Sequence, residues 1–545
     1  MRALSTARGP LATAVLALAF LAVALTTRLP FRDKTMFISD SVRYALALED
    51  YDMTAGRPHP PGNPLYIGTA AALDRFIDEP PVSLTVLSAV MSGIAFLFVY
   101  LLGRDLAGET AGWLAAGILI VSPLFWFFGA VAMPSTGEAA LSLIVAWLSR
   151  KARSPGDGRA FWIMTVALGV TFGFRSTFAI LLMPLWAYAV WRHPWKRIVA
   201  GAALLGVVFF GWTAVVASLS GGWAVYRETS SAFLADVVIA TKILGGGFAK
   251  IPRQGGAILI TAGLGLGPFL IPCAVGTWRC ATGKWPFPGA APFLAAWILP
   301  AIVFHAAYDW APRFGVPLMP PAAILAAATA VPMARRMFEG RRPAGATAGA
   351  GAFPGALILL ALAVNLGLFL LPVRLGPITL PEPFPSGSRL LARNEELSRR
   401  DATIRENFDP ETTVVLAYDH AFHVGYFLPE YRTVGLFPVF KQAADSWVPS
   451  FRHRRLDFEP GSGAIPVDNP LRLPDTIRHI VLYDGDYLPW WPDNALPLHP
   501  LSYDVDREIE IATVPGGGCL DYDFQRLRFV RRDADACLDA AGGGS

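Results

Sequence analysis

Long apolar segments, separated by short polar connections, follow one another over roughly the first two thirds of the chain. Two examples are residues 11–27 (LATAVLALAFLAVALTT) and 257–278 (AILITAGLGLGPFLIPCAVGTW). A helix of about 20 residues crosses the ~30 Å hydrocarbon core of a bilayer, so segments of this length predict membrane helices. We expect about eleven of them, near residues 11–27, 83–103, 110–130, 136–149, 160–174, 177–191, 198–218, 255–277, 288–304, 314–333 and 353–373.

The composition agrees with this pattern. Of the 545 residues, 54% are hydrophobic and 16% are charged, whereas soluble proteins average roughly 25% charged residues. The chain is therefore predicted to be an α-helical polytopic membrane protein. Since no apolar run of membrane length follows residue 374, we expect a transmembrane domain over residues 1–374, with a first outside loop at 28–81, and a separate domain over residues 375–545.

Basic residues gather in every second connection, at residues 149–159, 191–197, 278–285 and 334–342. The positive-inside rule assigns these loops to the cytoplasm. The N-terminus is then cytoplasmic, and the 28–81 loop and the C-terminal domain are periplasmic or extracellular, on a bacterial cytoplasmic membrane. The first apolar run could instead be a signal peptide, because Arg2 and Arg8 precede an Ala-rich core.

The net charge of +4 reflects this topology and says little about partners. No basic run interleaved with aromatic residues indicates nucleic-acid binding. The expected partners are membrane lipids and the substrates considered below.

The C-terminal domain alternates short apolar runs rich in β-branched residues with one helical segment. Strands are predicted at TTVVLAY, HIVLYDG, IEIATV and RLRFVRR, and a helix at AFHVGYFL. This order favours an α/β domain with a Rossmann-like character. It lacks a G-x-G-x-x-G motif, so we expect no nucleotide site.

Cys519 and Cys537 are the two cysteines of this outside domain. A disulfide between them in an oxidising compartment would contribute ~3 kcal/mol, and the alternative is two unpaired thiols. The other two, Cys273 and Cys280, lie in a predicted span and a cytoplasmic turn, where we expect neither metal nor disulfide chemistry.

The first outside loop has two parts. FISDSVRYALALEDYD predicts a short helix, capped by Ser39, Asp40 or Ser41, that lies along the membrane surface on an apolar face. The prolines of RPHPPGNPL then forbid helix and fix φ, which makes a stiff strap leading to the next span.

Ionisable side chains near the outer ends of the spans are the candidates for chemistry, because a charge at the bilayer centre costs ~2.5–3.5 kcal/mol. A cleft that collects carboxylates, arginines and a histidine suits a reaction between a lipid-linked anion and a polar acceptor. Arginines would hold a departing phosphate while a carboxylate takes the proton of the attacking hydroxyl. The candidates are Asp40, Glu49, Asp50, Asp52, Arg57, His59, Glu138, Arg175, Arg227, Lys242, His305, Tyr308, Asp309 and Arg313.

Each candidate also has a structural interpretation. Asp40 could cap its helix, the neighbouring acids could form a solvated face, and His59 could be a loop residue held by prolines. Arg175 could anchor a helix end, and Tyr308, Asp309 and Arg313 could form a local ion pair.

Three stretches carry a family resemblance. Residues 39–68, SDSVRYALALEDYDMTAGRPHPPGNPLYIG, resemble the first outside loop of GT-C membrane glycosyltransferases, in particular the bacterial protein O-mannosyltransferase-like and lipopolysaccharide-sugar-transferase-like members. AMPSTGEAALSLIVAWLSRKAR is similar to the second outside loop of the family, and YDWAPRFGVPLMPPAAILAA is similar to a late span entry.

The resemblance implies a GT-C-like fold and a polyprenyl-phosphate-linked sugar donor, used with inversion at the anomeric carbon. Asp40 matches the acid that in such enzymes activates the acceptor or helps to hold a metal, and Glu138 matches the acid of the second loop. A divalent ion, Mg²⁺ or Mn²⁺, would have these two acids as its candidate ligands. Arg43 stands where relatives often have a second acid, which argues against an acidic metal pair there.

The binding residues implied by the same matches contact donor or acceptor. Arg57 and His59 match the strap, and Arg313 matches a basic residue near the donor phosphate. The full set expected to bind donor or acceptor is Arg57, His59, Glu138, Arg175, Tyr308, Asp309 and Arg313.

The sequence leaves rival functions open. An O-antigen-ligase-like or polymerase-like transferase differs in its donor, not in its general chemistry. A lipid-linked-glycan transporter or flippase would need charged or broken-helix sites near the bilayer midplane and often has internal repeats, which the sequence does not show. A receptor or assembly factor would use the C-terminal domain to bind a partner. We favour the glycosyltransferase, with Asp40 as the base and a glycolipid, a glycan or a protein as the acceptor.

Overall fold

The structure is a computed structural model of the whole chain. It describes residues 9–36, 38–234, 250–285, 289–307, 310–339, 352–371, 374–375, 378–379, 385–417, 420–437, 440–443, 446–449, 454–459, 463–467, 471–472, 476–484, 491, 496–504, 507–514, 519–523 and 528–532.

The chain divides into two compact units. The first contains Met1–Asp33 and Pro60–Leu391, and the second contains Lys34–His59 and Ala392–Ser545. Part of the first outside loop, assigned from the sequence to the transmembrane domain, thus folds with the C-terminal residues.

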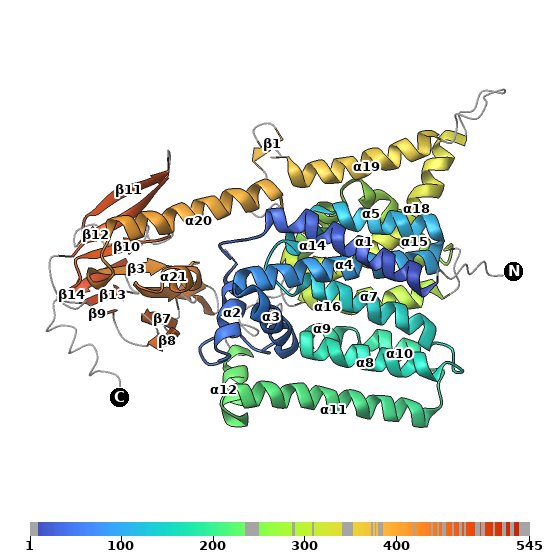
Figure 1. The fold of residues 1–545 in the computed structure, drawn as a ribbon, viewed down its shortest axis with the longest axis horizontal. Helices are drawn as coiled ribbons and strands as arrows, with labels where there is room; N and C mark the ends of the chain where they lie inside the picture. The colour runs from blue at the N-terminus through green and yellow to red at the C-terminus, as the bar shows by residue number, and fades with distance from the viewer. Residues whose placement is uncertain are drawn as a thin grey trace. The chain divides into compact units, whose positions relative to one another are not determined.

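The first unit is a helical bundle (Figure 1). Its helices are α1 (Pro10–Arg28), α3 (Pro64–Ile77), α4 (Pro80–Ala107), α5 (Glu109–Val121), α6 (Pro123–Gly129), α7 (Ser135–Ala152), α8 (Gly158–Phe174), α9 (Ser176–Leu181), α10 (Met183–Val190), α11 (Trp195–Leu219), α12 (Trp223–Phe233), α14 (Lys250–Leu266), α15 (Leu270–Ala281), α16 (Ala290–Ala307), α17 (Pro312–Gly315), α18 (Met319–Glu339) and α19 (Ala352–Leu370). Short 3-10 turns at Leu29–Phe31, Gly267–Phe269 and Val316–Leu318 and the two-residue strands β1 (Arg374–Leu375) and β2 (Ile378–Thr379) complete it.

Each of the predicted spans coincides with a helix or with two consecutive helices. Within the part of the chain that the structure describes, six helices are long and apolar enough to cross a membrane, and α5 and α6, bent by 63°, would together form a seventh. The number of eleven spans therefore stays a prediction. Helix α3 was not predicted, because Asp74 and Arg75 interrupt its apolar residues.

Prolines and glycines determine how these helices break and pack. Pro123 begins α6 after Ser122, whose side chain accepts a hydrogen bond from the Phe125 amide, so the chain bends between α5 and α6. Gly93 of α4 lets α1 approach closely, because a Cβ atom at this position would lie 2.9 Å from Leu21 Cα. Small residues at such crossings are typical of membrane helices, whose backbones pack directly against each other.

The second unit is built on a seven-stranded mixed sheet of order β11-β12-β10-β3-β4-β7-β8. These strands are β3 (Thr413–Ala417), β4 (Arg432–Phe437), β7 (Arg454–Glu459), β8 (Gly463–Val467), β10 (His479–Leu482), β11 (Leu498–Asp504) and β12 (Arg507–Thr513). The smaller sheets contain β5 (Phe440–Ala443), β6 (Ser446–Pro449), β9 (Leu471–Arg472), β13 (Cys519–Asp523) and β14 (Arg528–Arg532).

Three central strands, β10, β3 and β4, run parallel to one another. Val414 lies opposite Ile480 of β10 and Arg432 of β4. Every residue of β3 is buried, as expected for a strand covered on both faces. The predicted helix, α21 (Ala421–Phe427), lies between β3 and β10 in the chain, as expected, whereas β4, which directly follows α21, was not predicted.

Two further helices complete the second unit. Helix α20 (Gly387–Asn407), which extends into it from the first unit, was not predicted because its sequence is strongly polar. Helix α2 (Ser39–Glu49) was predicted, and its buried residues include Val42, Tyr44 and Ala45. Helix α2 packs against α21 of the same unit.

Candidate functional site

Glu138 of the first unit forms an ion pair with Arg175. Glu138 lies in the first turn of α7 and is only 5% exposed, and its Oε1 is 3.1 Å from Arg175 Nε. Arg175 has an extended backbone at the break between α8 and α9. Gly137 makes this approach possible, because a Cβ atom there would lie 2.3 Å from the Phe174 ring.

Arg313 and His305 belong to the same cluster. The charge of the Arg313 guanidinium group in α17 interacts with the Glu138 carboxylate. The charges of Arg175 and Arg313 both interact with the imidazole of His305, near the end of α16. The His305 ring stacks on Phe314, with 4.1 Å between ring centroids and an interplanar angle of 15°. We call Glu138, Arg175, His305 and Arg313 the arginine cluster; it joins one acid, one imidazole and two guanidinium groups from separate helices.

An apolar pocket of about 570 Å³ opens among helices α14 to α18. Leu266, Leu270, Ile298, Ile302, Trp310 and Gly315 are among the residues that line it. Trp310 and Gly315 flank Arg313 in the sequence, so the lining of the pocket includes the segment that carries Arg313. The Trp310 indole donates a hydrogen bond to Thr261 Oγ1 at 2.8 Å, which fixes the wall at this end.

In the second unit Asp40 pairs with His59. The distance from Asp40 Oδ1 to His59 Nδ1 is 3.6 Å, and both side chains are largely but not completely buried. Asp40 lies in the first turn of α2, where the helix dipole favours a carboxylate. The N-cap is Ile38, without a side-chain capping hydrogen bond, so the prediction that Ser39, Asp40 or Ser41 caps this helix is wrong.

The strap between α2 and α3 is held by local pairs. Arg57 Nη2 lies 3.2 Å from Asp50 Oδ2, and the Asp52 and Arg57 backbones form a short antiparallel bridge. The Asp52 carboxylate accepts hydrogen bonds from the Thr54 amide and hydroxyl, which closes the turn. Arg57, which was expected to bind substrate, thus helps to brace the strap. Asp50 and Asp52, which were expected on a solvated face, form local contacts within this loop.

Several predicted residues lie outside the described ranges. Tyr308, Asp309 and Lys242 are among them. The same applies to the Cys519–Cys537 disulfide, because Cys537 and the side chain of Cys519 are not described.

The side chains present do not fit a divalent metal ion. The Glu138 carboxylate is paired with a guanidinium group, and the Asp40 carboxylate is paired with a histidine. Within the described ranges, His, Cys, Asp and Glu residues form no group of three or more that could hold a metal. We derive no catalytic step that involves a metal.

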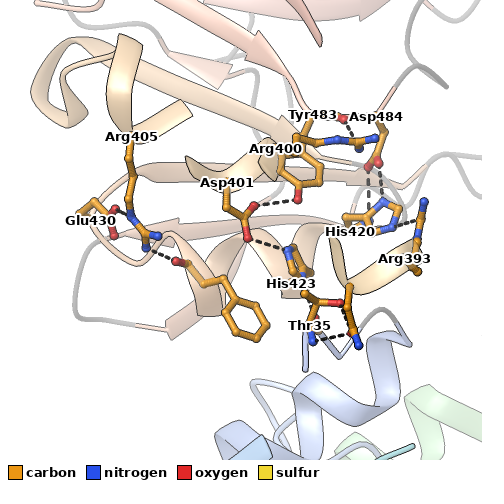
Figure 2. A network of polar contacts seen from close by, with 12 residues as sticks. Thr35, Arg393, Arg400, Asp401, Arg405, His420, His423, Glu430, Tyr483 and Asp484 are labelled. Carbon is orange, nitrogen blue, oxygen red and sulfur yellow. Dashed lines mark hydrogen bonds and ion pairs between the residues drawn. The ribbon is translucent and has the colours of Figure 1, made fainter. Parts of the chain in front are cut away.

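The second unit contains a buried polar network that was not predicted from the sequence. Figure 2 shows His420 and His423 of the α21 region together with Asp401 and Arg400 of α20 and with Tyr483 and Asp484, which follow β10. Burial, and secondarily the Asp401 carboxylate, raises the pKa of Tyr483 well above its ordinary value. The position of these polar residues just after two parallel strands was the signal that the sequence contained.

Comparisons with known proteins agree with this architecture. Residues 58–220 match the family described as dolichyl-phosphate-mannose-protein mannosyltransferase. No curated protein matches the chain.

Solved structures give matches along most of the chain. It is similar to ArnT from Cupriavidus metallidurans in the apo state, with a TM-score of 0.52 and 14% identity over 92% of this chain and 98% of that one. For the same protein bound to undecaprenyl phosphate the values are 0.50 and 14%, over 93% and 98%. The oligosaccharyltransferase of Archaeoglobus fulgidus matches at a TM-score of 0.47 and 12% identity, over 87% and 69%.

The likeness to the first of these structures shows a shared fold. In this chain the described residues form a mostly helical part and a C-terminal part that contains a sheet. The family match lies in the segment that begins at the strap and includes Glu138 and Arg175. The chain is therefore similar in fold to ArnT, and part of its helical region matches a glycosyltransferase family.

Proposed function

We propose that this protein transfers a sugar from a polyprenyl-phosphate donor to an acceptor outside the cytoplasm, with inversion at the anomeric carbon and Asp40 as the base. The observation that carries the donor assignment is the apolar pocket whose lining residues Trp310 and Gly315 flank Arg313. A polyprenyl phosphate has this chemistry, because a long apolar chain ends in an anion. ArnT, whose fold is similar, has been solved with undecaprenyl phosphate bound.

Arg175 and Arg313 hold the donor phosphate in this proposal. A guanidinium group donates two parallel hydrogen bonds to phosphate oxygens and stays charged at all physiological pH values. Glu138 holds Arg175 in place before the donor binds. His305, stacked on Phe314, supports the segment that carries Arg313.

Asp40 takes the proton of the acceptor hydroxyl. The hydroxyl oxygen attacks the anomeric carbon, the bond from that carbon to the phosphate oxygen breaks, and polyprenyl phosphate leaves with the electron pair. The transition state has oxocarbenium character, so it needs a base on the acceptor side and positive charge on the leaving group. One displacement of this kind inverts the anomeric centre.

The arginine cluster favours transfer over transport. Glu138 begins α7, Arg175 lies between α8 and α9, and His305 is near the end of α16. A transporter site is expected near the bilayer midplane instead. The active site is assigned to the outer face of a bacterial cytoplasmic membrane, with the N-terminus in the cytoplasm and the C-terminal unit outside, and with a glycolipid, a glycan or a protein as the acceptor.

Donor binding tests this proposal directly. The purified full-length protein in nanodiscs is titrated with undecaprenyl phosphate and, separately, with undecaprenol, which lacks the anion. We expect the phosphate to bind more tightly, and Arg313→Gln to weaken its binding about 10- to 100-fold, as for a lost charge-assisted hydrogen bond. The matched control is Arg159→Gln, in an exposed position of α8. Equal affinity for the two lipids, or equal effects of the two substitutions, would contradict the proposal.

A further inference from the structure

Two side chains of the C-terminal part hold the start of the first outside loop. Asn394 Oδ1 accepts hydrogen bonds from the Lys34 amide at 2.9 Å, from the Thr35 amide at 3.3 Å and from the Thr35 hydroxyl at 3.2 Å. His423 Nδ1 lies 2.6 Å from the Thr35 carbonyl oxygen. The sequence separation between His423 and Thr35 is 388 residues, so this anchor is purely tertiary.

His423 is itself held by a series of buried polar contacts (Figure 2). Its Nε2 lies 3.1 Å from Asp401 Oδ2, and the other oxygen of Asp401 accepts a hydrogen bond from the Tyr483 hydroxyl at 2.8 Å. His423, Asp401 and Tyr483 are 2%, 5% and 1% exposed. Arg400 Nη1 in turn donates to the Tyr483 carbonyl oxygen at 2.8 Å, which fixes the end of this chain.

The hydrogen-bond pattern shows how His423 holds the loop. The Thr35 carbonyl can only accept, so His423 Nδ1 carries a hydrogen and donates it to that carbonyl. The other ring nitrogen, Nε2, lies against Asp401, which also accepts from the Tyr483 hydroxyl. The ring is therefore held on both sides.

Aromatic rings also lie near His423. The His420 ring lies 6.2 Å away, centroid to centroid, and is itself bonded to Asp484 and to Arg393. The Phe427 ring lies at 4.7 Å. His423 therefore acts through two partners, Thr35 on one side and Asp401 on the other.

The residue before His423 holds the same loop at a second point. The guanidinium carbon of Arg43 lies 4.0 Å from the centroid of the Phe422 ring, a cation–π contact. Asp40 lies between Thr35 and Arg43 in the sequence. Helix α21 thus contacts the segment on both sides of Asp40.

We propose that His423, together with Asp401, is a positioning residue that holds the segment carrying Asp40 in its active arrangement. The catalytic meaning of this inference depends on the proposed function, whereas the anchoring does not. Neither residue touches the reacting atoms; they act through the Thr35 backbone and α2. The C-terminal unit then contributes to the reaction by fixing the loop that supplies the base.

Hydrogen exchange in the full-length protein in nanodiscs tests the anchoring without an activity assay. His423→Phe removes both polar contacts, and we expect amides of residues 34–49 to exchange at least tenfold faster, while amides of β3 and β10 keep their rates. His423→Asn preserves a donor at about the position of Nδ1 and should restore part of the protection. His499→Phe, in an exposed position of β11, is the matched control and should change neither region.

Two results would overturn the anchoring. Unchanged exchange in residues 34–49 shows that His423 does not hold the loop. Faster exchange in β3 and β10 as well shows that it serves general stability. If loop exchange rises as expected but Asp40→Asn leaves transfer intact, the anchoring stands and the proposed catalytic role of Asp40 fails.

Transfer kinetics supply the second readout. In His423→Phe we expect kcat to fall about tenfold or more, with the KM for the polyprenyl-phosphate donor little changed, because donor contacts are assigned to the first unit. His423→Asn should recover part of the lost kcat. A rise in donor KM with unchanged kcat would contradict a role in positioning Asp40.

Discussion

Asp40 and His59 lie at opposite ends of the loop segment that folds with the C-terminal residues, yet their side chains meet, with 3.6 Å between Oδ1 and Nδ1. The His59 ring also lies 5.9 Å from the ring of Tyr44, a buried residue of α2. The strap therefore folds back over the helix that carries the acid. This arrangement places His59 beside the acid that is proposed as the base.

His59→Ala should lower kcat about tenfold while leaving the donor KM within about twofold, because a side chain that orients the base is lost and no phosphate contact is removed. Steady-state kinetics with a polyprenyl-phosphate donor measure both constants. His499→Ala in β11 is the control for an exposed histidine. An unchanged kcat would show that His59 only braces the strap.

Gly137→Ala should destabilise the protein by roughly 1–3 kcal/mol through overpacking, since the new Cβ atom would meet the Phe174 ring. The ion pair of the adjacent Glu138 with Arg175 should loosen as α7 and α8 separate. Thermal unfolding of the protein in nanodiscs reports the stability loss.

A matched pair of controls isolates this contact. Gly206→Ala in α11, where nothing lies within 4 Å of the new atom, should have little effect. The double variant Gly137→Ala with Phe174→Leu should recover part of the loss. A Gly137→Ala protein as stable as the native one would contradict the close packing of α7 on α8.

Ala295→Phe should weaken binding of long polyprenyl phosphates at least tenfold by filling part of the apolar pocket, which Ala295 lines. A short-chain analogue such as geranyl phosphate should bind with little change, because it leaves most of the pocket empty. Titration of both lipids measures the difference. Val303→Phe, on an exposed position of the same helix, is the control, and an equal loss for both chain lengths would contradict the pocket assignment.

Most helices of the first unit were predictable because each contains a long apolar run. The close approaches at Gly93 and Gly137 were not, because they depend on neighbours from other helices. Helix α3 was missed because Asp74 and Arg75 interrupt its apolar residues, and α20 was missed because it is polar.

The candidate site was predictable by residue type but not by pairing. A carboxylate at the start of α7 and an arginine after α8 are visible in the sequence, whereas the ion pair of Glu138 with Arg175 is formed only by packing. The anchor between His423 and Thr35 spans 388 residues, and no local pattern encodes a contact of that length. Arg43 occupies the position where a second acid was considered, and in the structure its guanidinium group lies over the Phe422 ring.

The role of Asp40 as the base is the central claim, and transfer by Asp40→Asn tests it most directly. The variant keeps the size and shape of the side chain but cannot accept the proton of the acceptor hydroxyl. Cell-surface glycans of a deletion strain are compared after complementation with the native protein or with Asp40→Asn at equal protein levels. We predict that Asp40→Asn restores no product, with a loss of about 100-fold or more. Full restoration by Asp40→Asn would show that another group takes the proton.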